Sequence, residues 1–289
     1  FNVICVDNLY SSHHSNIASL ISNPNFLFLE QDVCKLKIND KVDYIYNLAC
    51  PASPVHYQFD PVKTIQTNIL GSINVLELAK KNKAKILQAS TSEVYGDPSI
   101  SPQKEDYWGN VNPIGIRSCY DEGKRAAETL FFDYYRQYKI NIKVCRIFNT
   151  YGPYMAQNDG RVISNFIIQA LNNKDLSIYG SGKQTRSFCY VDDLIDGLIK
   201  VMNTGDSFTG PINLGNDLEL SIKDVAQKII HLSNSQSSIN YINPVSDDPM
   251  QRKPDLGLAK KIINWNPEID LHQGLNLTID YFRNILKNN

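Results

Sequence analysis

A tyrosine and a lysine four positions apart, Tyr120 and Lys124, are the residues of this sequence best suited to chemistry. On a helix, residues at this spacing lie one turn apart on the same face. An ammonium group beside a phenol stabilises the phenolate, so we expect the pKa of Tyr120 to be lowered toward neutrality. Such a phenolate can act as a general base that takes a proton from a hydroxyl group while a hydride leaves the same carbon.

A second group of polar residues precedes this pair by about thirty positions. The apolar run Lys85–Gln88 continues through Ala89 into Ser90-Thr91-Ser92-Glu93, so hydroxyl groups and a carboxylate follow a strand at its carboxyl end. In open parallel sheets ligands bind at that edge. We therefore expect these side chains to share one crevice with Tyr120 and Lys124.

Short apolar runs alternate with long helical patterns through the first half of the chain. Strands are expected at 1–7, 26–29, 42–49, 84–90 and 142–148, and helices at 61–81 and 118–138. This alternation is typical of an α/β protein with a Rossmann-like, doubly wound parallel sheet. Asp7 stands at the end of its strand. In dinucleotide-binding folds the acidic residue that binds the ribose has this position, about 20 residues after a glycine-rich turn. Only six residues precede Asp7 in this sequence, and they contain no such turn. We therefore expect the first βα unit, about 25–35 residues, to be missing from this sequence.

The pattern changes after Gly152, where the strands become shorter and turns more frequent. A hairpin is expected between 177–180 and 186–191, and helices are expected at 192–203, 221–232 and 271–287. We interpret residues 1–152 as the dinucleotide-binding domain and residues 153–289 as a smaller, mostly substrate-binding region. Segments of this second region could return to the main sheet.

Composition and charge exclude several classes of protein. The chain has 289 residues, 42% of them hydrophobic and 20% charged, which is typical of a soluble globular protein. A net charge of -1 gives no reason to expect a nucleic acid or an anionic membrane as a partner. Six scattered cysteines without a CxxC pair indicate thiols in a reducing compartment, so a cytoplasmic location is expected. The five histidines show no metal-ligand spacing, and no metal is expected.

Several motifs together resemble a known family. Residues 90–97, the Tyr120 and Lys124 pair, and residues 149–153 and 179–186 resemble the extended short-chain dehydrogenase/reductases that act on nucleotide sugars. Within that family, residues 47–54, 105–113 and 115–125 resemble the UDP-glucuronate decarboxylases, also called UDP-xylose synthases. The resemblance covers nearly the whole chain, and the motifs occur in the family's order and spacing.

The resemblance implies an enzyme that uses NAD in a closed cycle. C4 of UDP-glucuronate would be oxidised with Tyr120 as the base, carbon dioxide would leave the 4-keto acid, and returning the hydride would give UDP-xylose with no net change in NAD. The implied catalytic residues are Tyr120, Lys124, Glu93, Thr91, Ser92 and Arg186. The implied NAD-binding residues are Asp7, Asn8, Asp32, Val33, Leu48, Ala49, Asn68, Ser90, Tyr120 and Lys124. The implied substrate-binding residues are Glu93, Asn149, Arg161, Tyr179, Gln184, Arg186 and Arg252.

Individual roles also follow from the resemblance. Glu93 would bind ring hydroxyls, and Arg186 would lie near the carboxylate and C5. Asn149, Arg161 and Arg252 would meet the diphosphate and the uridine ribose. Related enzymes are typically homodimers paired through two long helices, here at about 61–81 and 117–138. The residues that could face a partner are Ile65, Ile69, Thr129, Phe132 and Tyr135.

Some alternatives stay open at this point. The related decarboxylases usually carry arginine where this chain has Tyr154, which could weaken phosphate or subunit contacts. A nucleotide-sugar 4,6-dehydratase would typically show Asp-Glu after the threonine, where this chain has Ser92-Glu93. A 4-epimerase needs no arginine near a C5 carboxylate. An inactive nucleotide-sugar-binding protein is the alternative of another class.

Overall fold

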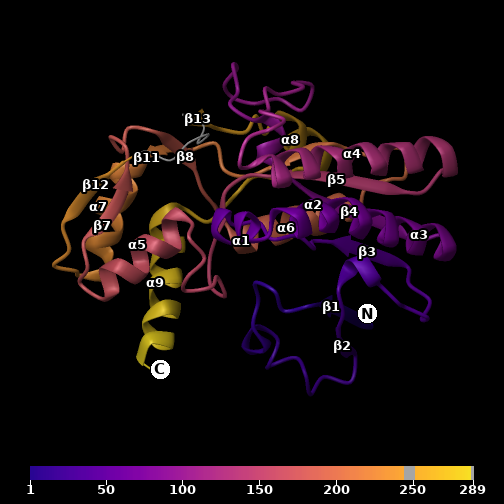
Figure 1. The fold of residues 1–289 in the computed structure, drawn as a ribbon, viewed down its shortest axis with the longest axis horizontal. Coiled ribbons are helices and arrows are strands. Elements are labelled where there is room, and N and C mark those ends of the chain that lie inside the picture. The colour runs from indigo at the N-terminus through magenta and orange to yellow at the C-terminus, as the bar shows by residue number, and fades with distance from the viewer. Residues whose placement is uncertain (244–250, 288–289) are drawn as a thin grey trace.

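The computed structural model describes residues 1–243 and 251–287, so parts of the expected substrate-binding region, 244–250 and 288–289, lie outside the described residues. The main sheet has four parallel strands in the order β10-β5-β4-β3. These are β3 (Tyr44–Asn47), β4 (Lys85–Thr91), β5 (Ile142–Ile147) and β10 (Ile212–Leu214). A separate pair of parallel strands, β1 (Val3–Asp7) and β2 (Phe26–Glu30), lies below β3 in Figure 1. All five strands expected in the first half of the chain are present.

Helices cover both faces of the main sheet because successive strand residues point to opposite sides. On β4, Ile86 packs in one hydrophobic cluster with α3 (Ser72–Asn82) and α4 (Ser118–Tyr138). The next residue, Leu87, packs in another cluster with α6 (Val191–Met202), α8 (Gly257–Ile263) and Trp265. The α/β class with a doubly wound parallel sheet is therefore confirmed.

The helix expected at 61–81 forms in three consecutive pieces. Asp60 caps α2 (Pro61–Gln66) by accepting a hydrogen bond from the Lys63 amide at 3.0 Å, and Pro61 occupies the first turn, where its missing N–H costs nothing. A π-helical turn over Thr67–Gly71 then leads into α3. A short helix that the sequence did not indicate, α1 (Pro54–Phe59), precedes them.

The second half of the chain packs around a hydrophobic cluster of its own. It joins α5 (Val162–Leu171), α7 (Ile222–Ser233) and α9 (Leu271–Lys287) to β7 (Leu176–Tyr179), on the left in Figure 1. The helices expected at 192–203, 221–232 and 271–287 are α6, α7 and α9. The expected return to the main sheet is made by β10, which pairs with β5.

The hairpin expected from residue 177 to residue 191 is wrong. β7 pairs in parallel with β12 (Ile239–Ile242), whereas β8 (Thr185–Ser187) pairs with β11 (Glu219–Ser221) and β13 (Gln251–Arg252). Gly180 and Gly182, at φ 68° and 71°, turn the chain between β7 and β8, but both strands find their partners elsewhere in the sequence. Two further short strands, β6 (Thr150–Tyr151) and β9 (Cys189–Tyr190), pair with each other. Among the described residues, no helix is both long enough and apolar enough to cross a membrane.

Candidate active site

The turn after β4 presents Thr91, Ser92 and Glu93 at the carboxyl end of the sheet, as expected. A short 3-10 helix begins at Ser92, and the Thr91 hydroxyl caps it by accepting a hydrogen bond from the Glu93 amide at 3.2 Å. The chain then turns at Gly96, whose φ is 63°. A Cβ there would lie 2.0 Å from the Asn110 carbonyl oxygen, so only glycine fits this turn.

Glu93 is held by two arginines from distant parts of the chain. Both terminal nitrogens of Arg252 contact its carboxylate, with Nη2 2.9 Å from Oε2, and Nη2 of Arg117 lies 2.8 Å from the same oxygen. Burial favours the neutral acid, but the charges and hydrogen bonds of Arg252 and Arg117 outweigh it and lower the pKa of Glu93 to about 2. Arg252, expected at the diphosphate end, contacts Glu93 through its guanidinium in this structure.

Tyr120 and Lys124 occupy one face of α4, as their spacing predicts, and both are buried. The Tyr120 ring stacks on Tyr57, with centroids 5.0 Å apart and planes 8° from parallel. The ammonium of Lys124 donates to the Ala89 carbonyl at 2.9 Å and lies 5.8 Å from the centroid of the Tyr120 ring.

The expected lowering of the Tyr120 pKa is wrong for this structure. Burial raises the pKa of Tyr120 well above 10, although the hydrogen-bonding Thr91 side chain acts in the opposite direction. Burial also lowers the pKa of Lys124, and Cys50 and Glu128 only partly offset this effect. The Lys124 ammonium, which was expected to stabilise the Tyr120 phenolate, donates to the Ala89 backbone carbonyl.

A buried polar network lies beneath these residues. The Ser90 hydroxyl, expected to meet the cofactor, donates to Oε1 of Glu128 at 2.6 Å. Arg146 donates to both oxygens of Glu128, at 2.9 and 2.8 Å, and to the Tyr95 hydroxyl at 3.0 Å. Tyr95 donates in turn to Asn213 at 2.8 Å. The network thus ties α4 to β4, β5 and β10, and it fixes the helix that carries Tyr120 and Lys124.

The polar residues expected at the adenosine half of the cofactor, Asp7, Asn8 and Asp32, form hydrogen bonds or ion pairs within the structure. Oδ1 of Asp7 accepts from the Leu9 amide at 2.7 Å, and Oδ1 of Asn8 accepts from the Tyr10 amide at 3.2 Å. Asp32 caps the turn Val33–Lys35 and pairs with Lys63. These contacts fix the carboxyl ends of β1 and β2, where a ligand of a parallel sheet would lie.

The other expected cofactor residues surround the end of β3 and the π-helical turn. Leu48 follows β3 and is 57% exposed, and Ala49 beside it is half-buried. Asn68 is buried, and its amide nitrogen donates to Thr64 at 3.2 Å. Its amide oxygen accepts no hydrogen bond from the residues that the structure describes. Val33 packs against the turn, since a Cβ on Gly71 would lie 2.7 Å from its Cγ1.

The residues expected at the substrate are divided between two places. Arg186 on β8 is the register partner of Arg252 on β13, so both side chains lie on the same face of the strand pair, and the Arg252 guanidinium contacts Glu93. Arg161 is held by Asp159, with Nε 2.5 Å from Oδ2. The other three expected residues are Gln184, Tyr179 and Asn149. Gln184 donates to the carbonyl of the half-exposed Tyr179 at 2.8 Å, and Asn149 is half-buried beyond β5.

Sequence reasoning missed three residues around Glu93. They are Arg117 and Asp121, which flank the start of α4, and Tyr57 of α1. Arg117 precedes Tyr120 by three positions, so the helical spacing that identified Lys124 could also have identified it. Asp121 and Tyr57 carry no comparable pattern, because they become buried only in the folded chain.

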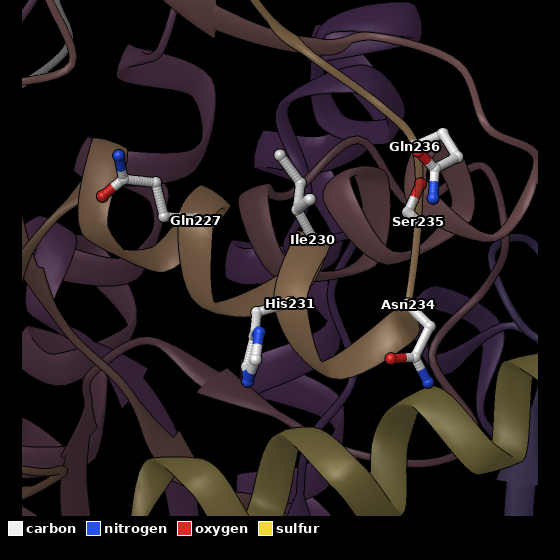
Figure 2. Close-up of a pocket in the computed structure, with 6 residues that line it drawn as sticks. All are labelled: Gln227, Ile230, His231, Asn234, Ser235 and Gln236. Atoms are coloured by element: carbon white, nitrogen blue, oxygen red, sulfur yellow. The ribbon is translucent and has the colours of Figure 1, made fainter.

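A hollow of about 420 Å³ lies elsewhere, at the end of α7 and the loop after it. Figure 2 shows its lining by Gln227, Ile230, His231, Asn234, Ser235 and Gln236. None of these residues belongs to the site built around Glu93 and Tyr120.

Comparisons with known proteins agree with this geometry. The family model described as the NAD dependent epimerase/dehydratase family matches residues 1–215. UDP-glucuronic acid decarboxylase 3 of Arabidopsis thaliana is 52% identical over 281 residues, which cover 97% of this chain and 81% of the relative. The structure of UDP-glucose 4-epimerase from Thermotoga maritima with UDP-glucose matches with a TM-score of 0.90 at 27% identity, covering 99% of this chain and 92% of that one.

A further solved structure contains both kinds of ligand. UDP-glucuronic acid 4-epimerase from Bacillus cereus, in complex with UDP-glucuronic acid and NAD, matches with a TM-score of 0.89 at 28% identity, covering 98% of this chain and 91% of that one. The fold, the Tyr120 and Lys124 pair and these likenesses lead to one conclusion: this chain belongs to the NAD dependent epimerase/dehydratase family.

Proposed function

We propose that this protein converts UDP-glucuronate to UDP-xylose and carbon dioxide with NAD as its cofactor. The observation that carries the proposal is the 52% identity, over 97% of the chain, to a plant UDP-glucuronic acid decarboxylase. The site adds chemical support, because two guanidinium groups that meet at Glu93, one buried and one half-buried, suit a substrate that carries a carboxylate.

The residues at the strand ends fit a dinucleotide. The unpaired amide oxygen of buried Asn68 can accept a hydrogen bond from a ligand, and an exposed Leu48 offers an apolar surface for a ring. Gly123 lets α4 approach, since a Cβ there would lie 2.7 Å from Nδ2 of Asn68. We propose that Asn68, Leu48, Ala49 and Lys124 hold the nicotinamide half, and that Asp7, Asn8, Asp32 and Val33 hold the adenosine half. Bound NAD would accept a hydride from C4 of the sugar and later return it.

The chain's own groups would manage protons and charge. Tyr120 takes the proton from the C4 hydroxyl, and Thr91 and Ser92 hydrogen-bond the sugar around that position. The resulting ketone is β to the carboxylate, so the C5–carboxyl bond breaks and its electron pair moves into the C4 carbonyl. Protonation at C5 then restores the ketone, which is reduced to the xylose.

We assign recognition of the substrate's acid to the cations around Glu93. Arg252 and Arg117 already bind one carboxylate there, and Arg186 lies on the same face of the adjacent strand. Glu93 then acts mainly by holding these guanidinium groups in place, in addition to any contact with the ring hydroxyls. Asn149, Arg161, Tyr179 and Gln184 remain proposed contacts of the nucleotide half.

The proposal includes an arrangement of domains, an assembly and a location. Residues 1–152 would bind NAD, and residues 153–289 would mostly bind the nucleotide sugar. A homodimer would pair through α2, α3 and α4, where Thr129 is exposed and Ile65, Ile69, Phe132 and Tyr135 are half-buried. All six cysteines are free thiols, which supports a cytosolic location. Light scattering on a size-exclusion column would test the dimer, and cell fractionation would test the location.

The reaction is tested by incubating the full-length protein with UDP-glucuronate and NAD. We expect carbon dioxide and a UDP-pentose in equal amounts, no accumulation of NADH, and turnover by Tyr120→Phe reduced by roughly 10²–10⁴-fold. A product of unchanged mass would indicate a 4-epimerase, and loss of water would indicate a dehydratase. Tight binding of UDP-glucuronate without any product would indicate an inactive binding protein.

A further inference from the structure

Asp121 is a buried acid that the proposed reaction does not use. It follows Tyr120 near the start of α4, and only 7% of the residue is exposed. Its Oδ1 atom is fully enclosed and accepts no hydrogen bond from any residue in the described ranges. An ionised carboxylate with one oxygen cut off from both water and a donor is disfavoured, so its neutral form is favoured.

Charged and titratable groups face Asp121 from each element packed around it. They are Glu93 after β4, Arg117 before α4, Arg252 on β13, Glu122 and Cys119 on its own helix, and Tyr57 on α1. Burial first, and then the charge of Glu93, raise the pKa of Asp121, whereas Arg117 and Arg252 lower it. The balance leaves its pKa raised to about 7.

The two arginines are the link between Asp121 and the substrate. Their guanidinium groups already serve ionised Glu93, so the substrate's carboxylate would be a second anion beside them. Ionised Asp121 would be a third anion, and like charges at close range repel one another. A proton on Asp121 removes that repulsion.

We propose that Asp121 holds a proton in the free enzyme and that this proton makes the site selective for the carboxylate-bearing substrate over its decarboxylated product. The inference rests on the proposed function, since it takes the substrate's carboxylate to lie against Arg117 and Arg252. UDP-xylose has no carboxylate, so its binding does not depend on the charge of Asp121. Asp121 is thus a specificity-determining residue, and pH sets the ratio of the two affinities.

Calorimetric titrations of the NAD-loaded Tyr120→Phe protein, whose turnover is expected to be reduced by roughly 10²–10⁴-fold, test this. Between pH 7 and 8.5 we expect the affinity for UDP-glucuronate to fall by about 15-fold in all, approaching tenfold per pH unit at the alkaline end, while that for UDP-xylose stays constant. Buffers of different ionisation enthalpy should reveal proton uptake near pH 7.5 with UDP-glucuronate alone. Adding Asp121→Asn should abolish both the uptake and the pH dependence. Adding Asp133→Asn, an exposed acid on the same helix, should preserve both.

The outcomes separate this inference from the function beneath it. Equal pH dependence for the two ligands, or pH dependence that survives Asp121→Asn, would overturn the role of Asp121. If Asp121→Asn does not fold, proton uptake by the parent protein decides, and its absence overturns the inference. Failure of UDP-glucuronate to bind at any pH would instead refute the proposed function, and this inference with it.

Discussion

Replacing Glu93 by glutamine should destabilise the protein by an amount that depends on pH in a defined way. Lowering the pKa of Glu93 from 4.5 to about 2 corresponds to about 3 kcal/mol in favour of the folded, ionised form. Breaking a buried ion pair costs about 3–5 kcal/mol, which agrees with that figure. We therefore expect Glu93→Gln to lose about 3 kcal/mol of unfolding free energy at pH 7.

The sign of the pH dependence follows from the lowered pKa. A group whose pKa is depressed by folding stabilises the protein above its unfolded pKa, here 4.5, and loses that contribution as the pH falls toward about 2. The difference between the parent protein and Glu93→Gln should stay constant from pH 7 to pH 5. It should then shrink steadily down to pH 3, because Glu93 becomes protonated in the unfolded chain below about pH 5. In the folded protein Glu93 begins to be protonated only near pH 3.

Urea unfolding followed by tryptophan fluorescence at pH 7, 5, 4 and 3 measures this difference. Asp133→Asn is the matched control, because it removes one carboxylate from an ion pair with Arg136 whose side chains are 56% and 65% exposed. Exposed pairs contribute about 0.2–1 kcal/mol, so this control should change little. The reasoning fails if the two variants lose equal stability, or if the loss in Glu93→Gln is the same at pH 3 as at pH 7.

Three further perturbations test the catalytic helix. Tyr120→Phe should reduce kcat by roughly 10²–10⁴-fold while leaving the affinity for UDP-glucuronate unchanged, as measured by carbon dioxide release and calorimetry. Glu128→Gln removes a carboxylate that favours the charged form of Lys124, so the pKa of Lys124 should fall further. The alkaline limb of the pH profile of kcat should then move to lower pH, and an unmoved limb would contradict this role. Gly123→Ala places a Cβ 2.7 Å from Nδ2 of Asn68, and it should weaken NAD binding in a fluorescence titration while leaving the thermal midpoint within a few degrees.

Local patterns in the sequence were enough for the first half of the fold. The helix from Ser118 to Tyr138 has the expected ends, and β3, β4 and β5 of the main sheet lie within two residues of their expected places. These elements depend on periodic burial and on caps within a few positions, which a sequence displays directly. The helix at 61–81 was also found, but its π-helical turn was not, since that distortion has no periodic pattern.

Errors arose where distant segments meet. The turn at Gly180 and Gly182 resembles a hairpin, yet β8 pairs with residues 219–221 and 251–252. The same pairing brings Arg252 to Glu93, a contact that no local pattern in the sequence indicates. The predicted lowering of the Tyr120 pKa was wrong for a related reason. Helical spacing predicts that Lys124 is near Tyr120, but not that its ammonium donates to the Ala89 carbonyl.

The separation of Glu93 and Arg252 along the chain has a consequence for biosynthesis. The two residues are 159 positions apart. At roughly 5–20 residues per second, a ribosome needs roughly 8 to 32 s to go from one to the other. During that interval Glu93, Tyr120 and Lys124 have all been synthesised, but the second guanidinium that Glu93 needs does not yet exist. A nascent chain that ends between Lys124 and Arg252 therefore contains the proposed proton-transfer residues but lacks one of the two arginines that bind Glu93. Until β13 has been synthesised, Glu93 must stay hydrated or protonated.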